Sequence, residues 1–282
     1  MPELTEDWPL LRTALGARGV EAEAVPWRDT SVDWSSFDLV LANGVWDYLH
    51  RPDELLGWIA HVADELGVPV VNSPDLLRWN MDKHYLRDLE AAGVPVVPTT
   101  WIEPGDAEPQ EFPEGEFVVK PAISCGGFST ARYGASSHAA ARAHVEALHD
   151  AGRTVLVQPY QGSVDTQGET ALVFLGGVFS HAVCKGPMLR RHAGPRASLV
   201  GHEVVTASTP SADQIALGTR AVAAAARTAP PAYARVDTVR DPWGRPCILE
   251  LELLEPALFL ATAPGATDRF ADVLTERLAA RT

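Results

Sequence analysis

The sequence predicts a fold of the α/β (α+β) class, because helical and strand-like patterns alternate along most of the chain. The chain has 282 residues, of which 46% are hydrophobic and 21% are charged. These proportions are typical of a globular protein with a substantial core, and they exclude disordered, collagen-like and low-complexity chains. A chain of this length is expected to form two lobes or one large domain.

The amino-terminal ~75 residues are typical of a parallel βαβ module. The helices carry apolar residues at helical spacing, and the strands are short apolar runs. In order, the expected elements are helix Leu10–Arg18, strands Val20–Trp27 and Asp38–Leu41, helix Pro52–Leu66 and strand Val68–Asn72. Such modules usually open with a strand, whereas residues 1–7 are mostly polar or proline. Either the start codon is assigned too late or the sheet lacks its first strand.

The rest of the chain continues the alternation and adds two hairpins. A helix beginning at Asn80, with this residue as its N-cap, is followed by strands and a loop rich in proline and glutamate over residues 103–115. The expected elements are helix Asn80–Ala92, strands Val94–Trp101 and Glu116–Lys120, helix His138–Ala151, strand Thr154–Pro159, hairpin Thr170–Lys185, helix Ser211–Thr228, hairpin strands Tyr233–Val239 and Cys247–Leu254, and helix Thr267–Ala280.

Charge and cysteine content exclude several classes of function. The chain has 37 acidic and 23 basic residues and a net charge of −14, which disfavours binding to nucleic acid or to an anionic membrane. It contains no apolar run long enough for a membrane span and begins with acidic residues. Its 3 cysteines are widely separated and form no CxxC pair. We therefore expect a cytoplasmic protein.

Two carboxylates on one predicted strand give the first chemical signal. Side chains alternate along a strand, so Glu250 and Glu252 project from one face while the flanking leucines project into the core. Asp237 on the partner strand can face them, and three neighbouring anions favour a divalent cation such as Mg²⁺ between them. The spacing alone is equally compatible with a solvent-exposed acidic hairpin.

A lysine followed by a glycine-rich loop gives the second signal. Lys120 ends a buried strand, and the segment Ser124–Thr130 supplies glycine, serine and threonine. An ammonium group and several backbone N–H groups around one concavity suit a polyphosphate. The segment has neither the P-loop nor the GxGxxG pattern, and a purely structural turn is the alternative.

Seven motifs follow one another over residues 70–262 in the order typical of ATP-grasp enzymes, which the chain therefore resembles. They are Met81-Asp82-Lys83, Val119-Lys120-Pro121 with its glycine loop, Gln158-Pro159-Tyr160, Gly168-Glu169, Lys185, Arg235-Val236-Asp237 and Glu250-Leu251-Glu252. Within that superfamily, Trp46-Asp47-Tyr48 and the runs over residues 78–83 and 251–260 are most similar to the cyclo-ligases of cycloserine biosynthesis, which close O-ureido-D-serine.

The resemblance implies an ATP-grasp fold in which two α+β subdomains grip ATP, preceded by a small parallel α/β domain. The implied boundaries are 1–78 for the amino-terminal domain, 79–157 for the central subdomain and 158–282 for the carboxy-terminal subdomain. The implied partners are a small molecule carrying a carboxylate or an amine, and a second copy of the chain in a homodimer.

The resemblance also implies a role for each motif residue. Lys83 and Lys120 would hold the α- and β-phosphates of ATP, and Glu169 would bind the ribose. Lys185 and Arg235 would neutralise the γ-phosphate and the acyl phosphate. The loop residues Ser124, Gly126, Gly127, Phe128 and Ser129 would cover the phosphates, the hinge residues Gln158, Pro159 and Tyr160 would bind adenine, and Asp237, Glu250 and Glu252 would bind two Mg²⁺ ions, with Mn²⁺ able to replace them. Many ATP-grasp enzymes have Asn where this chain has Glu252.

The implied reaction joins a carboxylate to an amine through an acyl phosphate, either within one amino-acid-derived molecule or between two molecules as in D-alanine and glutathione ligases. Catalysis of this kind depends on positioning and charge neutralisation, so it requires no nucleophilic serine or cysteine. Cys125 and Cys184 are therefore interpreted as small packing residues. An ATP-binding module without activity is the alternative, and the complete set of motif residues argues against it.

Substrate recognition has weaker signals. Arg190, Arg191 and Arg196 form the one basic cluster of an acidic chain and could bind a carboxylate or the γ-phosphate, although a solvated surface loop explains them almost as well. Asn43 and Trp46 follow a predicted strand, where open α/β sheets bind ligands. His181, His192 and His202 lack metal-ligand spacing and are interpreted as ordinary polar residues.

Overall fold

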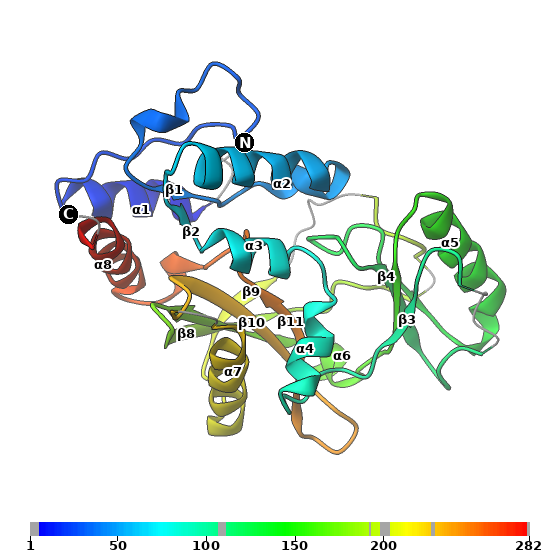
Figure 1. The fold of residues 1–282 in the computed structure, drawn as a ribbon. Helices are drawn as coiled ribbons and strands as arrows, with labels where there is room; N and C mark the ends of the chain where they lie inside the picture. Colours follow the sequence, from blue (N-terminus) through cyan, green and yellow to red (C-terminus); the bar gives the residue numbers. More distant parts are fainter. Residues whose placement is uncertain (1–5, 107–110, 192, 198–203, 227–228, 281–282) are drawn as a thin grey trace.

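The computed structural model describes residues 6–106, 111–191, 193–197, 204–226 and 229–280. In this part of the chain, three sheets are covered by helices (Figure 1), which confirms the predicted α/β (α+β) class. One sheet is parallel and two are antiparallel. None of the described helices is both long and apolar enough to cross a membrane.

The amino-terminal region contains the predicted βαβ module. Helix α1 (Asp7–Gly16) precedes strand β1 (Val40–Leu41), and helix α2 (Pro52–Ala60) with a π-helical turn leads to strand β2 (Val70–Val71). The two strands are parallel. The strand predicted over Val20–Trp27 is wrong, because this segment is assigned no strand and pairs with no strand of the described chain.

The central four-stranded sheet has the order β3-β6-β4-β5. Its strands are β3 (Thr100–Ile102), β4 (Phe117–Pro121), β5 (Ala131–Tyr133) and β6 (Val155–Pro159). Helix α5 (His138–Asp150) buries Val145 and Leu148 against this sheet, at the right of Figure 1. Lys120 is thereby fixed near the end of the central strand β4.

The larger sheet is antiparallel and has the order β11-β10-β7-β8-β9. Both predicted hairpins are present in it. The strands are β7 (Glu169–Leu175), β8 (Val178–Lys185), β9 (Val205–Ser208), β10 (Tyr233–Arg240) and β11 (Pro246–Glu252). Helix α7 (Ala212–Ala225) begins with a Ser211–Gln214 capping box and packs on this sheet, whereas α8 (Ala266–Ala279) lies beside α1 (Figure 1).

Only part of the predicted helix Asn80–Ala92 is helical, namely α4 (Tyr85–Ala91), and Asn80 is the last residue of a preceding helix, α3 (Pro74–Asn80). Asn80 ends the first helix instead of capping a helix that follows, because its side chain is hydrogen-bonded elsewhere. Its amide donates to Leu251 O at 2.7 Å, and its carbonyl oxygen accepts from Leu253 N–H at 2.6 Å. The break places Lys83 in the turn between α3 and α4 and attaches that turn to β11.

A second buried asparagine links the amino-terminal module to the larger sheet. Asn72 follows β2, donates to Tyr233 O and Leu253 O at 3.0 and 2.8 Å, and accepts from Ala232 N–H at 2.7 Å.

The predicted strand Val94–Trp101 is shorter than expected, since only Thr100–Ile102 forms β3 and Val96 makes a single bridge to Ile248. This bridge joins the segment before β3 to β11 of the larger sheet.

Candidate functional site

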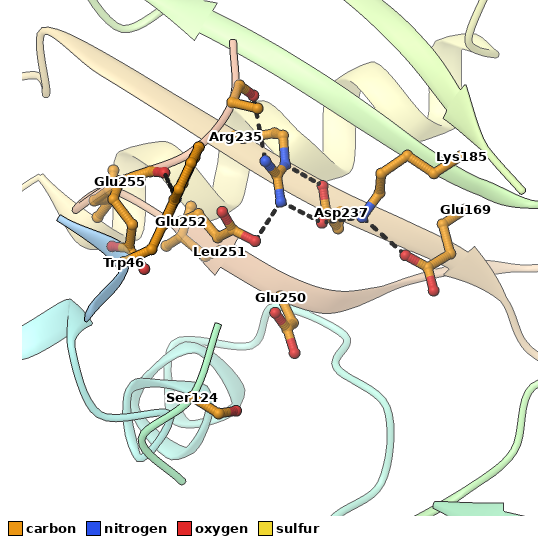
Figure 2. Close-up of polar contacts among 12 residues, drawn as sticks. Trp46, Ser124, Glu169, Lys185, Arg235, Asp237, Glu250, Leu251, Glu252 and Glu255 are labelled. Atoms are coloured by element: carbon orange, nitrogen blue, oxygen red, sulfur yellow. Dashed lines mark hydrogen bonds and ion pairs between the residues drawn. The ribbon is translucent and has the colours of Figure 1, made fainter. Parts of the chain in front are cut away.

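The site is built on the hairpin of β10 and β11. Asp237 lies directly opposite Glu250, and Arg235 lies opposite Glu252, with a register shift just after Asp237. These four side chains share one face of the hairpin (Figure 2), whereas Leu251 is buried on the other. The strand pairing therefore brings the three predicted carboxylates together, and an acidic hairpin open to solvent is excluded because Asp237 is only 2% exposed.

Every one of these carboxylates is paired with a cation. Asp237 accepts hydrogen bonds from Lys185 Nζ at 2.7 Å and from Arg235 Nε at 2.9 Å. Arg235 also binds Glu252, and Lys120 Nζ donates to Glu250 Oε1 at 2.8 Å. Figure 2 shows Arg235 between Asp237 and Glu252, with Glu250 pointing away from it. We refer to Lys120, Lys185, Arg235, Asp237, Glu250 and Glu252 as the ion-pair network.

Burial and these cations set the protonation of the network. Burial alone would raise the pKa of Glu250, but Lys120 and Lys83 outweigh it and hold this pKa below its usual range. Arg235 and Lys185 likewise overcome burial and lower the pKa of Asp237. Glu252 differs, because burial raises its pKa to about 7 against the opposing effect of Arg235.

The predicted metal ligands are adjacent but do not form a ready metal site. Among the residues that the structure describes, no three His, Cys, Asp or Glu side chains are placed to hold one ion. The lysines and Arg235 stand where divalent cations would otherwise neutralise the carboxylates. The donor set still fits Mg²⁺, because carboxylate oxygens are its preferred protein ligands and the displaced lysines could pair with phosphates instead.

Lys83 approaches the glycine loop from the turn between α3 and α4. Its ammonium group donates to Ser124 O at 2.6 Å and Ser124 Oγ at 3.3 Å. The backbone N–H of Lys83 donates to Ala122 O. Lys83 and Lys120 are each 5% exposed. Lys83 thus contacts the first residue of the glycine loop, and Lys120 lies on the strand β4 that leads toward that loop.

The loop Ser124–Thr130 has backbone conformations that favour glycine. Gly126, Gly127 and Ser129 have φ values of 55°, 68° and 52°. A Cβ atom on Gly127 would lie 3.0 Å from Met188 Sδ and 3.3 Å from Arg196 Cδ, so the segment after β8 closely covers the loop. Phe128 anchors the loop by packing edge-on against His50, which ends a short helix at Trp46–His50.

The three arginines of the basic cluster, Arg190, Arg191 and Arg196, have different surroundings. Arg196 forms two backbone hydrogen bonds with the glycine loop, to Ser129 and Thr130, and its Nε is buried without a partner among the described residues. Such an unsatisfied donor beside a glycine loop fits an anionic ligand. Arg191 instead pairs with Glu116 at 2.8 Å, and Arg190 is exposed. The surface-loop interpretation therefore describes Arg190 but not Arg196.

The predicted hinge lies where β6 ends. Gln158 is buried, and its side chain donates to Thr99 Oγ1 at 2.8 Å, while Pro159 is the last residue of the strand. The Tyr160 ring stacks on the Arg132 guanidinium, 3.4 Å from the ring centroid. Glu169, at the start of β7, pairs with Lys185 at 3.0 Å and thus extends the ion-pair network toward this end.

Glu255 is a site residue that the sequence reasoning missed. It is 6% exposed, its carboxyl is hydrogen-bonded by the buried Tyr48, and its backbone oxygen accepts from Trp46 Nε1 at 3.1 Å. Burial raises its pKa to about 8, with the charge of Glu252 adding to the effect. A single glutamate within the apolar run Leu253–Leu260 was the available signal. Trp46 thus reaches the site, whereas Asn43 lines a separate cavity beside β1.

The remaining polar candidates have structural surroundings. Burial raises the pKa of the Cys125 thiol well above its usual value, and Cys184 donates to Gln167 O, so both fit the packing role. His181 is an ordinary polar residue, because its Nε2 donates to Leu258 O and its Nδ1 accepts from the Ser180 hydroxyl. His192 and His202 lie outside the described residues.

We expect Glu255→Gln to flatten the pH dependence of stability. The pKa of Glu255 is 4.5 in the unfolded chain and about 8 in the folded protein, so the folded state retains a proton that the unfolded state has released. Its contribution to stability is complete below pH 4.5 and is lost as the pH rises through about 8. Wild-type unfolding free energy should fall by a few kcal/mol over this range.

Urea unfolding between pH 5 and 8.5, without Mg²⁺ or nucleotide, measures this effect. The matched variant Glu276→Gln, on the exposed side of α8, should keep the wild-type slope. Equal slopes in the wild type and Glu255→Gln would show that Glu255 is already ionised at neutral pH.

The chain is similar to known proteins along its whole length. Residues 1–72 match the family model of the N-terminal domain of D-cycloserine synthetase DcsG. The cycloserine biosynthesis protein DcsG of Streptomyces lavendulae is 39% identical over 289 residues, which cover 96% of this chain and 94% of that protein. A crystal structure of D-cycloserine synthetase DcsG has a TM-score of 0.88 at 36% identity, covering 99% of this chain and 98% of that one.

A more distant solved structure has the same fold. The ATP-grasp ligase PsnB, complexed with a phosphomimetic variant of its minimal precursor, Mg and ADP, has a TM-score of 0.62. It is 17% identical and covers 96% of this chain and 95% of that chain. At this identity the likeness concerns the fold alone.

Proposed function

The chain belongs to the DcsG family of ATP-grasp ligases, and we propose from this premise that it uses ATP and Mg²⁺ to close a ring within one amino-acid-derived substrate. The product of such a reaction would be a cyclic amide of the cycloserine type. One observation carries the proposal: six charged side chains of opposite sign converge beside a glycine loop, and the loop is backed by a lysine and by an unsatisfied arginine donor.

The proposed nucleotide site follows from these neighbours. Lys83 and Lys120 pair with the α- and β-phosphates, and the loop over Ser124–Thr130 supplies backbone N–H groups around them. Arg196 Nε donates to a phosphate oxygen, and the hinge over residues 158–160 contacts the base. Glu169 binds the ribose. Binding of the phosphates would take Lys120 away from Glu250 and free that carboxylate for the metal.

The proposed metal ligands are Asp237, Glu250 and Glu252, holding two Mg²⁺ ions. When bound, Mg²⁺ neutralises phosphate charge and holds the phosphates in line for transfer. Because Glu252 and Asp237 are both held by Arg235, the protein's own residues already place two of the three carboxylates.

The proposed chemistry needs positioning more than a protein nucleophile. A substrate carboxylate oxygen bonds to the γ-phosphorus while the bond to the ADP oxygen breaks, which gives an acyl phosphate and ADP. In O-ureido-D-serine the attacking atom is the ureido nitrogen bonded to oxygen, because attack by the α-amine would close a three-membered ring. This nitrogen bonds to the acyl carbon, the carbon–oxygen bond to phosphate breaks, and the nitrogen loses a proton to solvent. Water then adds to the carbamoyl carbon and the bond from this carbon to the ring nitrogen breaks, which leaves the N–H of a cycloserine-type ring and releases carbamic acid, the source of carbon dioxide and ammonia. Lys185 and Arg235 stabilise the negative charge on the transferring phosphoryl group. Glu255, Tyr48 and Trp46 line the substrate side.

ADP release by the purified protein tests this proposal. We expect ADP with O-ureido-D-serine as the sole added substrate, in a Mg²⁺-dependent reaction that liberates one phosphate per cyclic product. A requirement for two different substrates would indicate ligation between molecules, as in D-alanine or glutathione ligases. No ADP with O-ureido-D-serine or with any amino acid of a full panel would mean an ATP-binding module without activity.

Three further parts belong to the same proposal. We place the amino-terminal domain at 1–78, the central subdomain at 79–157 and the carboxy-terminal subdomain at 158–282. We place the reaction in the cytoplasm, where ATP is available. We propose a homodimer, whose molar mass would be measured by light scattering as the protein elutes from a size-exclusion column.

A further inference from the structure

A cavity of about 560 Å³ lies in the amino-terminal region, away from the ion-pair network. Two chain segments form its sides, residues 19–25 on one and residues 37–41, including β1, on the other. Leu11 and Leu15 of α1, with Phe270 and Leu274 of α8, contribute to the lining from the helical side, and Trp27, Trp34 and Trp58 also line it. Most of the lining residues are apolar, and the polar ones are Asp7, Glu21, Glu23, Ser36, Asp38, Asn43 and Thr275.

One side of the cavity is the free edge of β1. Val40 N–H and Ala42 N–H donate to Pro69 O and Val71 O beside β2, at 2.8 and 3.2 Å. Because backbone groups alternate in direction along a strand, the N–H and C=O groups of Leu39 and Leu41 are directed away from β2. Both residues line the cavity.

The other side is the segment over residues 21–25, which follows α1. Its exposure alternates from residue to residue, with Ala22 and Ala24 less exposed than Glu21 and Glu23, as in a strand with one covered face. No hydrogen bond joins its backbone to another strand within the described ranges. Within the part of the chain that the structure describes, two backbone edges without a strand partner therefore flank one cavity.

These surroundings are those of an inner strand in a parallel sheet. Such a strand has a neighbour on each side and helices on both faces, so it is apolar throughout. Here α1 and α8 lie on one face, and Trp34 with Trp58 of α2 lie on the other. An apolar strand would bury its side chains against the leucine, phenylalanine and tryptophan side chains of these two faces.

We propose that the cavity seats one further β-strand of about five apolar residues, which pairs with Leu39–Leu41 on one side and with residues 21–25 on the other. We commit to a strand that precedes Met1 in the chain. Trp8 and Leu11, at the start of α1, line the cavity, and in a βα unit the strand leads directly into the helix that covers it.

An amino-terminal fusion tests this proposal without reference to catalysis. The tag Val-Ile-Val-Leu-Val is placed before Met1, and the matched control is Val-Pro-Val-Pro-Val, which has the same length but cannot complete the hydrogen bonding. We expect the first tag to raise Tm by about 5 °C or more and to slow amide exchange of Leu39 and Leu41 at least tenfold. The proline tag should change neither quantity.

Two results would overturn the proposal. Equal Tm and equal exchange rates with both tags would show that the cavity takes no strand. An untagged dimer that dissociates when the first tag is added would assign the cavity to a second copy of the chain instead. If the tagged protein does not fold, the same pentapeptide added to the untagged chain should still protect Leu39 and Leu41, and failure to protect them counts against the proposal. Loss of ligase activity affects none of these readouts.

Discussion

Glu250→Gln is expected to reduce kcat by at least ~100-fold. Glu250 is the partner of Lys120 at 2.8 Å and is held ionised by two lysines, so the change removes a charge that the site maintains despite burial. A glutamine oxygen is a weaker ligand for Mg²⁺, and the remaining activity should therefore need more Mg²⁺. The glutamine can still accept a hydrogen bond from Lys120, so the loss of stability should stay at about 1–3 kcal/mol.

The measurement is a series of Mg²⁺ titrations of ADP release. Glu146→Gln, on an exposed position of α5, is the matched control and should behave as wild type. Unchanged turnover of Glu250→Gln at limiting Mg²⁺ would remove Glu250 from the proposed metal ligands.

Arg235→Lys should reduce kcat by about 100-fold and also lower stability. The guanidinium binds both oxygens of Asp237, at 2.9 and 3.1 Å, together with Glu252 and Ala257 O. A lysine has one nitrogen and cannot reproduce this fork, so Asp237 and Glu252 would repel each other in a buried setting. We expect unfolding to become easier by about 2–4 kcal/mol.

Arg240→Lys provides a control on the same strand. Arg240 binds Ser211 and Gly244 near the far end of β10, away from the carboxylates. The kcat of the Arg240→Lys variant should stay within about twofold of wild type, because the change removes no charge and touches no proposed metal or nucleotide ligand. A wild-type kcat for Arg235→Lys would show that the charge alone, without the planar fork, is sufficient.

Much of the ion-pair network could be predicted because it depends on local rules. The two-residue period of strands places Glu250 and Glu252 on one face, and a short turn brings Asp237 opposite them. The prediction missed that each acid is already matched by a basic group, because two of these partners, Lys120 and Lys185, come from β4 and β8, which are distant in sequence. Pairing between distant elements leaves no periodic pattern in the chain.

The wrong predictions share a dependence on distant partners. Asn80 has the residue type of an N-cap, but β11 binds its amide and turns it into the end of a helix. Residues 20–27 have the composition of a strand, yet strand structure needs a neighbour with free hydrogen-bonding groups. Glu255 was missed because its one signal, a single glutamate in an apolar run, has no period, and burial beside Tyr48 is what distinguishes it.

The mutual pairing of lysines, arginine and acids makes entry of ligands an exchange reaction. ATP alone would draw Lys120 to its phosphates and leave Glu250 buried without a counter-ion. Mg²⁺ alone would bind Glu250 and leave Lys120 buried without a counter-ion. Only the two together satisfy both signs of charge. The affinity for nucleotide and the affinity for metal must then increase each other reciprocally, and free Mg²⁺ or uncomplexed ATP should each bind only weakly.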